Sequence, residues 1–116
     1  MQKIKVVVKE PFKTAQVREI EPKLSVFQGL VDGYIDAVTP NEYCYGHNIS
    51  AYINDDGKIY HLYPNLRLWG GKDYIAGTCV FTKADENGND ISMSEEEIQY
   101  ILRLCRETEY HLDEFI

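Results

Sequence analysis

Residues 60–77 read YHLYPNLRLWGGKDYIAG, and we expect the rest of the chain to be built around presenting them. The stretch holds the single tryptophan of the chain, Trp69, next to the glycine pair Gly70 and Gly71. None of its residues places a nucleophile beside a base, which a covalent catalyst needs. The stretch therefore predicts a binding protein rather than an enzyme, and it calls for no cofactor.

Two alternating runs precede this stretch and overlap its start. Residues 47–54 and residues 58–62 each alternate apolar with polar side chains, and Asp-Asp-Gly at residues 55–57 separates them. An Asp-Gly turn supplies the positive φ values that a tight hairpin needs. We therefore expect the two runs to pair as neighbouring strands.

The chain after the expected hairpin predicts a loop, a buried strand and a second loop. Residues 64–72 are expected to form the first loop, and residues 74–83 are apolar enough for one central strand. Gly77 interrupts this strand and marks a bulge or a close backbone approach. The polar residues 84–92 then form a surface loop.

The N-terminal part of the chain predicts a hairpin, a short helix and a further strand. Residues 3–9 and 14–20 alternate like half-buried strands. Pro22 favours the first turn of a helix, and Gly33 is suited to end it. Residues 34–38 resume strand alternation, and a polar turn with a tyrosine-rich connection follows them.

The last helix has a strong start signal. The Ser94 hydroxyl is placed to accept the N–H of the third helical residue while the Glu97 side chain reaches back, which is a capping box. Apolar residues then recur at helical spacing and predict one buried stripe, made of Ile98, Ile101, Leu102, Cys105 and Leu112. We expect this helix to pack across the sheet.

The expected order of elements is β-β-α-β-β-β-β-α, which predicts an α+β fold with a mainly antiparallel sheet of about five to six strands and two helices. Residues 1–116 have the size of a single domain. We expect both helices to cover one face of the sheet and leave the other exposed, used for binding or buried in a homo-oligomer. The nine tyrosines favour the last two options, because tyrosine is common in interfaces.

Charge and composition exclude several classes of function. The net charge of −7 repels phosphate backbones at long range, which counts against general nucleic-acid binding. Lysines interrupt the apolar N-terminus and no apolar run is long enough to span a bilayer, so a cytoplasmic protein without membrane contact is expected. Cys44, Cys79 and Cys105 are odd in number and far apart, and we expect them to be reduced core residues.

Groups that bind anions and aromatic rings cluster in residues 60–77. Arg67 and Lys72 supply charge, Trp69 offers a stacking surface, and the glycine pair offers backbone N–H groups. These are the parts of a pocket for a nucleotide-sized anion. In the alternative interpretation, Arg67 pairs with a surface carboxylate and Trp69 closes the core. The candidate ligand-binding residues are Tyr63, Asn65, Arg67, Trp69, Gly70, Gly71, Lys72 and Tyr74.

The histidines suggest two further kinds of site. Cys44 and His47 have a spacing seen in metal sites and His61 could lie near them, but a fourth ligand is missing, so no metal site is predicted. A small enzyme that uses His47 or His61 as a base would need a carboxylate or a thiol within hydrogen-bonding reach of one of them.

Six short segments together resemble a family of small uncharacterised domains found in phages, plasmids and conjugative elements of bacteria. In that family a Pro-Asn-Arg-type segment and a later glycine recur, and here Leu66 separates Asn65 from Arg67. The resemblance implies an accessory protein of a mobile element and brings no established activity. The segments are Lys5–Pro11, Val17–Ile20, Leu30–Val38, Asn54–Lys58, Pro64–Leu68 and Ile75–Gly77.

Two hypotheses about function follow. The first is a non-enzymatic counter-defence protein that sequesters a nucleotide-derived immune signal in the bacterial host cytoplasm, with stacking on aromatic side chains and contacts to phosphates. The second is an acidic inhibitor or adaptor that binds a host defence protein, in one form as a nucleic-acid mimic. Sequestration requires Arg67 and Lys72 to converge in a pocket, whereas mimicry requires carboxylates spaced along an open face.

Overall fold

The computed structural model describes residues 2–115 and has an α+β fold with a mainly antiparallel sheet. Three α-helices, eight strands and two short 3-10 helices make up the described chain. In chain order they are β1 (Ile4–Lys9), β2 (Gln16–Ile20), α1 (Leu24–Val31), β3 (Ile35–Val38), α2 (Glu42–Gly46), β4 (Ile49–Asn54), β5 (Pro64–Leu68), η1 (Trp69–Gly71), β6 (Asp73–Ala76), β7 (Cys79–Ala84), β8 (Asp90–Ile91), α3 (Glu95–Thr108) and η2 (Leu112–Phe115).

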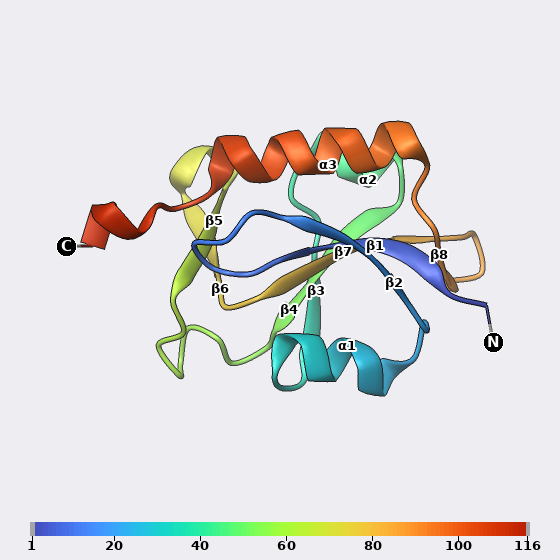
Figure 1. Ribbon diagram of the computed structural model, residues 1–116, viewed down its shortest axis with the longest axis horizontal. Helices are drawn as coiled ribbons and strands as arrows, with labels where there is room; N and C mark the ends of the chain where they lie inside the picture. The colour runs from blue at the N-terminus through green and yellow to red at the C-terminus, as the bar shows by residue number, and fades with distance from the viewer. Residues whose placement is uncertain (1, 116) are drawn as a thin grey trace.

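The strands form one large sheet and one small sheet. The large sheet has six strands in the order β2-β1-β7-β4-β3, with β8 paired to β7, and every pairing in it is antiparallel. Strands β5 and β6 form a separate antiparallel pair, joined by η1, at the end of the molecule where the C-terminal segment projects (Figure 1). The expected hairpin of β1 and β2 is confirmed.

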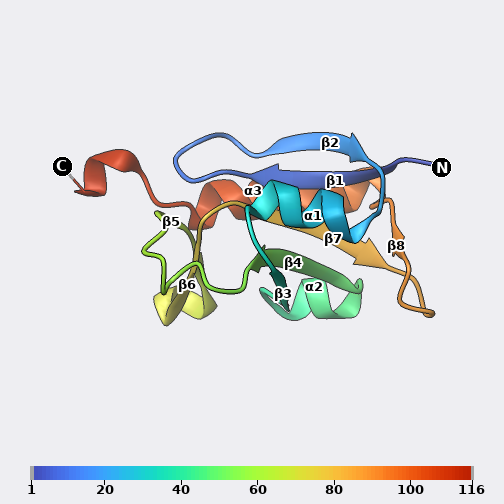
Figure 2. The same cartoon turned by 90° about the horizontal axis from the view of Figure 1, so that it is seen from below.

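Helices α1 and α3 lie on opposite faces of the large sheet (Figures 1 and 2). Val7 packs with Ile98 and Ile101 of α3 in one core, whereas Val6 and Val8 pack with α1 in the other. The expectation that both helices cover the same face is therefore wrong. The physical reason lies in β1, whose three consecutive valines point alternately to the two faces, so that both faces are apolar and both need a cover.

The capping box at the start of α3 is confirmed. The Ser94 hydroxyl accepts the N–H of Glu97, and the Glu97 carboxylate accepts the N–H of Ser94. The predicted stripe is correct up to Cys105, but the helix ends at Thr108. Leu112 lies beyond it in η2 with 55% of its surface exposed, so its assignment to the buried stripe is wrong.

The predicted hairpin between residues 47–54 and 58–62 is wrong. Residues 55–61 form turns, and β4 already pairs with β3 on one edge and with β7 on the other. No edge of β4 is left for a further strand. The Asp-Gly sequence still makes a turn, in which the Asn54 side chain accepts the N–H of Asp56 and the Asn54 carbonyl accepts the N–H of Gly57.

Four further boundaries differ from the sequence prediction. The loop expected over residues 64–72 contains β5 and η1, the tyrosine-rich connection contains α2, and the polar loop over residues 84–92 contains β8. The single strand expected over residues 74–83 is two strands in two sheets. Gly77 divides them, because its φ of 83° is a conformation that turns the chain and that L side chains rarely adopt.

Replacing Gly57 by alanine should destabilise the fold by about 1–3 kcal/mol. A Cβ at this buried position would lie 2.7 Å from the carbonyl oxygen of Ala76. This oxygen belongs to the backbone, so it cannot move aside as the end of a flexible side chain can. Gly29→Ala is the matched control, because a Cβ there meets nothing within 4 Å and alanine favours the helix by about 0.5–1 kcal/mol. Urea unfolding of both variants measures the difference, and equal stabilities would contradict the close packing at Gly57.

Candidate functional site

The candidate residues of the stretch 60–77 fall into three structural groups. Asn65 is fully buried, while Arg67 and Tyr74 are partly covered. The remaining five lie at the surface of the small sheet or the loop before it, and they are Tyr63, Trp69, Gly70, Gly71 and Lys72. The structure therefore separates groups that the sequence placed in one pocket.

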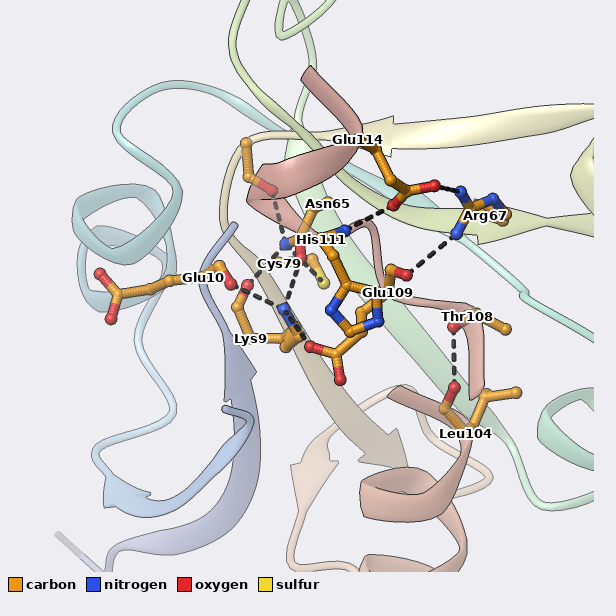
Figure 3. Close-up of polar contacts among 11 residues, drawn as sticks. Lys9, Glu10, Asn65, Arg67, Cys79, Leu104, Thr108, Glu109, His111 and Glu114 are labelled. Carbon is orange, nitrogen blue, oxygen red and sulfur yellow. Dashed lines mark hydrogen bonds and ion pairs between the residues drawn. The ribbon is translucent and has the colours of Figure 1, made fainter. Parts of the chain in front are cut away.

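Asn65 joins the small sheet to the large one (Figure 3). Its Nδ2 donates to the carbonyl oxygen of Lys9 at 2.7 Å and to that of Gly77 at 2.8 Å, and its Oδ1 accepts from Lys9 Nζ at 3.1 Å. Lys9 is itself fully buried, and its Nζ also donates to the carbonyl oxygen of Glu10 and lies 3.8 Å from Glu109 Oε1. Asn65 thus bonds within the protein instead of facing a ligand.

Arg67 faces the segment after α3 (Figure 3). Its Nη1 donates to the carbonyl oxygen of Glu109 at 2.9 Å, and its Nη2 pairs with the Glu114 carboxylate. The guanidinium also lies 3.9 Å from the centre of the Tyr110 ring, as in a cation–π contact. For Arg67 the alternative interpretation, pairing with a surface carboxylate, is confirmed.

Trp69 lies at the surface at the turn between β5 and β6. Its φ is 49°, and 53% of its surface is exposed, so the alternative that it closes the core is wrong. The turn and the segments 55–63 and 112–115 lie at the same end of the molecule (Figures 1 and 2). We call their large exposed apolar side chains, each between 53% and 72% exposed, the aromatic surface: Ile59, Tyr60, Tyr63, Trp69, Leu112 and Phe115.

A pocket of about 240 Å³ lies between the small sheet and strands β3 and β4. Val38, Ile53 and Leu68 are among its apolar lining, and Lys58 pairs with Asp73 beside it. Ligand pockets usually span roughly 300–1,000 Å³. Of the eight candidate residues only Tyr74 lines it, so the two cations Arg67 and Lys72 do not converge there.

His47 forms a second polar cluster with α3. The Glu97 carboxylate accepts from Lys83 Nζ at 2.7 Å and lies 2.8 Å from His47 Nδ1. Tyr43 stacks on the imidazole, with ring centres 4.0 Å apart. The hypothesis of a small enzyme required a carboxylate within hydrogen-bonding reach of a histidine, and the pair of His47 with Glu97 provides this contact. The nearby Cys44 thiol is buried, which raises its pKa to about 11 and keeps it protonated and unreactive.

The cysteines are core residues, as expected. Cys44, Cys79 and Cys105 are free thiols and all three are buried. Burial raises the pKa of Cys105 to about 12 and that of Cys79 well above its ordinary range. Across residues 2–115 no three His, Cys, Asp or Glu side chains are grouped so that they could hold a metal ion. Nor does any helix in that range have the length and apolar character to cross a membrane.

Sequence reasoning missed the residues around Arg67. The prediction of a half-buried strand over residues 3–9 implied an exposed Lys9, although the preceding Val6-Val7-Val8 was a signal that both faces of β1 are buried. The partners in residues 109–115 were hidden by the expected helix, which was extended to Leu112. The pairing of His47 with Glu97 had no signal in the sequence, because the two residues are 50 positions apart.

Asn65→Ala should lower the free energy of unfolding by about 3 kcal/mol. The substitution removes three buried hydrogen bonds and takes a partner from the buried Lys9 ammonium. Tyr60→Ala is the control five residues away, and since its side chain is exposed it should change stability by no more than about 0.5 kcal/mol. Denaturant titration gives both values, and a small effect at Asn65 would show that the two sheets are held together elsewhere.

The Glu97 carboxylate should make stability depend on pH below its ordinary pKa of 4.5. Burial raises this pKa, but hydrogen bonds from Lys83, Ser94 and His47 outweigh the effect of burial and bring the pKa down to about 2. Because the pKa is lower in the folded state, the stabilisation is complete above pH 4.5 and is lost as the pH falls towards 2. The loss should reach about 3 kcal/mol.

Glu97→Gln should remove this part of the pH dependence. The exposed neighbour Glu96 provides the control, and Glu96→Gln should keep the wild-type profile. Urea unfolding at several pH values between 7 and about 2.5 gives the free energies to compare. Parallel profiles for wild type and Glu97→Gln would contradict the assigned pKa.

Comparison with known proteins identifies a family and no individual relative. Neither the curated proteins nor the solved structures give a match. The family described as Domain of unknown function (DUF3846) matches residues 4–106, which confirms the expectation of an uncharacterised domain family. The matched residues include β5 and Arg67 and end within α3, before residues 109–115. With most of its length matched, this chain belongs to the DUF3846 family.

Proposed function

We propose that the protein is a non-enzymatic accessory protein that binds another protein through the aromatic surface, and so inhibits or recruits it. The observation that carries the proposal is the exposure of Trp69 at the turn between β5 and β6. Tryptophan and tyrosine dominate the energetics of protein interfaces, because each buries a large area at a small cost in side-chain entropy.

The arrangement around Trp69 supports a broad contact. Gly70 and Gly71 have φ values of 67° and 88°, and a side chain at either position would meet open space. Both positions are therefore open at the surface, and Tyr60 and Tyr63, each 69% exposed, lie in the loop before β5, at the other end of that strand from Trp69. The exposed apolar groups therefore lie at both ends of β5, and a partner that contacts them all must span the small sheet.

The charge of the chain favours a protein as the partner. A net charge of −7 repels phosphate backbones at long range, which disfavours nucleic acids. The proposal retains the counter-defence role in a phage or other mobile element as its biological setting. Sequestration of a nucleotide-derived signal has less support, because Arg67 already pairs with Glu114 and neither Arg67 nor Lys72 lines the pocket beside the small sheet.

Affinity capture with variants of the aromatic surface tests the proposal. The purified chain should retain a specific protein from the host lysate. The double variant Tyr60→Ala/Trp69→Ala should retain at most about one-tenth of the amount that the wild type captures. Tyr45→Ala is the control, because Tyr45 is 79% exposed on α2, outside the aromatic surface. All three proteins should have the same melting temperature, since the altered side chains are exposed.

A screen for nucleotide binding tests the competing hypothesis of sequestration. Thermal-shift measurements would use cyclic and linear nucleotides, including molecules of the cyclic ADP-ribose type, with mass spectrometry of each ligand afterwards. A ligand at 100 times its dissociation constant adds about 2.7 kcal/mol of stability. A shift with unaltered ligand would replace our proposal with sequestration, and conversion of the ligand would identify an enzyme. Capture that the double variant leaves unchanged would also overturn the proposal.

A further inference from the structure

After α3 has ended, the chain runs along the edge of β5 at Glu109 and Tyr110 and then forms η2 (Figure 3). Glu109 forms an isolated antiparallel bridge with Leu66, and the N–H of Tyr110 donates to the carbonyl oxygen of Asn65 at 3.0 Å. A short stretch of extended backbone thus pairs with β5 on the edge that β6 leaves open. This is the geometry by which a sheet edge receives a peptide.

Two side chains of the segment attach it to Arg67. The Tyr110 ring packs under the guanidinium at 3.9 Å, and four residues later the Glu114 carboxylate pairs with Arg67 Nη2. Phe115 adds an edge-to-face contact with Phe12, with ring centres 5.8 Å apart. Arginine thereby recognises an aromatic face and a carboxylate at once.

The segment is only lightly held. Residues 111–115 are all exposed, and the two members of the pair between Arg67 and Glu114 are 35% and 39% exposed. Such partly exposed pairs contribute about 0–1 kcal/mol each. Segments with few buried contacts open at a much lower free energy than the core does. Arg67 and β5 lie inside the family domain, whereas this segment lies outside it.

We propose that the β5 edge at Arg67 is a peptide-binding site and that residues 109–115 fill it in place of a partner. The occupant is a partner peptide with an aromatic residue on extended backbone, followed by a helical turn that returns a carboxylate four residues later to Arg67, as in Tyr110 and Glu114. This inference rests on the proposed protein-binding function and names the chemistry of the partner. Opening the segment also removes Glu109 and Glu114, which leaves Arg67 and the Lys9 ammonium as a local positive site.

A labelled peptide with the sequence of residues 109–115, EYHLDEF, tests the site by fluorescence anisotropy. The full chain carrying Tyr110→Ala/Glu114→Ala should bind it at least tenfold more tightly than the wild type, whose own segment competes at a high effective concentration. Adding Arg67→Ala should abolish binding. The titration uses 0.15 M salt, where the Debye length of about 8 Å limits repulsion from the acidic chain.

A charge exchange separates recognition from folding. The chain with Tyr110→Ala/Glu114→Ala/Arg67→Glu should reject the original peptide and bind one in which the residue matching Glu114 is arginine. Equal binding by wild type and the opened chain, or failure of the exchange, would overturn the site. If light scattering finds dimers of the wild type and only monomers of the Tyr110→Ala/Glu114→Ala chain, the edge binds a second copy, which would overturn the partner peptide. Capture through Trp69 that persists in the Arg67→Ala variant would then leave the proposed function intact.

Discussion

The buried amide of Asn65 is the contact on which the arrangement of the two sheets depends. A buried amide must find hydrogen-bond partners within the protein, and here the partners are backbone groups of β1 and Gly77 together with the Lys9 ammonium. The amide therefore fixes the small sheet against the large one and fixes the position from which Arg67, two residues later, faces outwards.

The sequence predicted elements best where a local signal and the tertiary structure agree. The capping box of α3 and the hairpin of β1 and β2 have such signals, and both are confirmed. The Asp-Gly signal at residues 55–57 failed because β4 had partners on both edges, a fact that depends on β7, which comes three strands later in the chain. The same limit applies to the helices, since the face that each covers depends on packing.

The candidate site was predictable as a set of residue types and not as an arrangement. Trp69 and the glycine pair do form an exposed turn, but Arg67 points to a segment that the sequence assigned to a helix. The stop of α3 at Thr108 has no glycine or proline beside it, so composition gave no sign of it. The His47 and Glu97 pair was equally hidden, because it is made only when α2 reaches α3.

Strand β7 lies between β1 and β4 in the large sheet, so this sheet cannot be completed until β7 has been synthesised. Strand β1 pairs with β7 through contacts such as that of Val7 with Phe81, more than 70 positions later. The hairpin of β1 and β2 is synthesised before β7, and Val6, Val7 and Val8 stay uncovered until α1 and α3 can pack on the two faces. Strands exposed in this way are prone to aggregate, and the lysines that flank the valines oppose it.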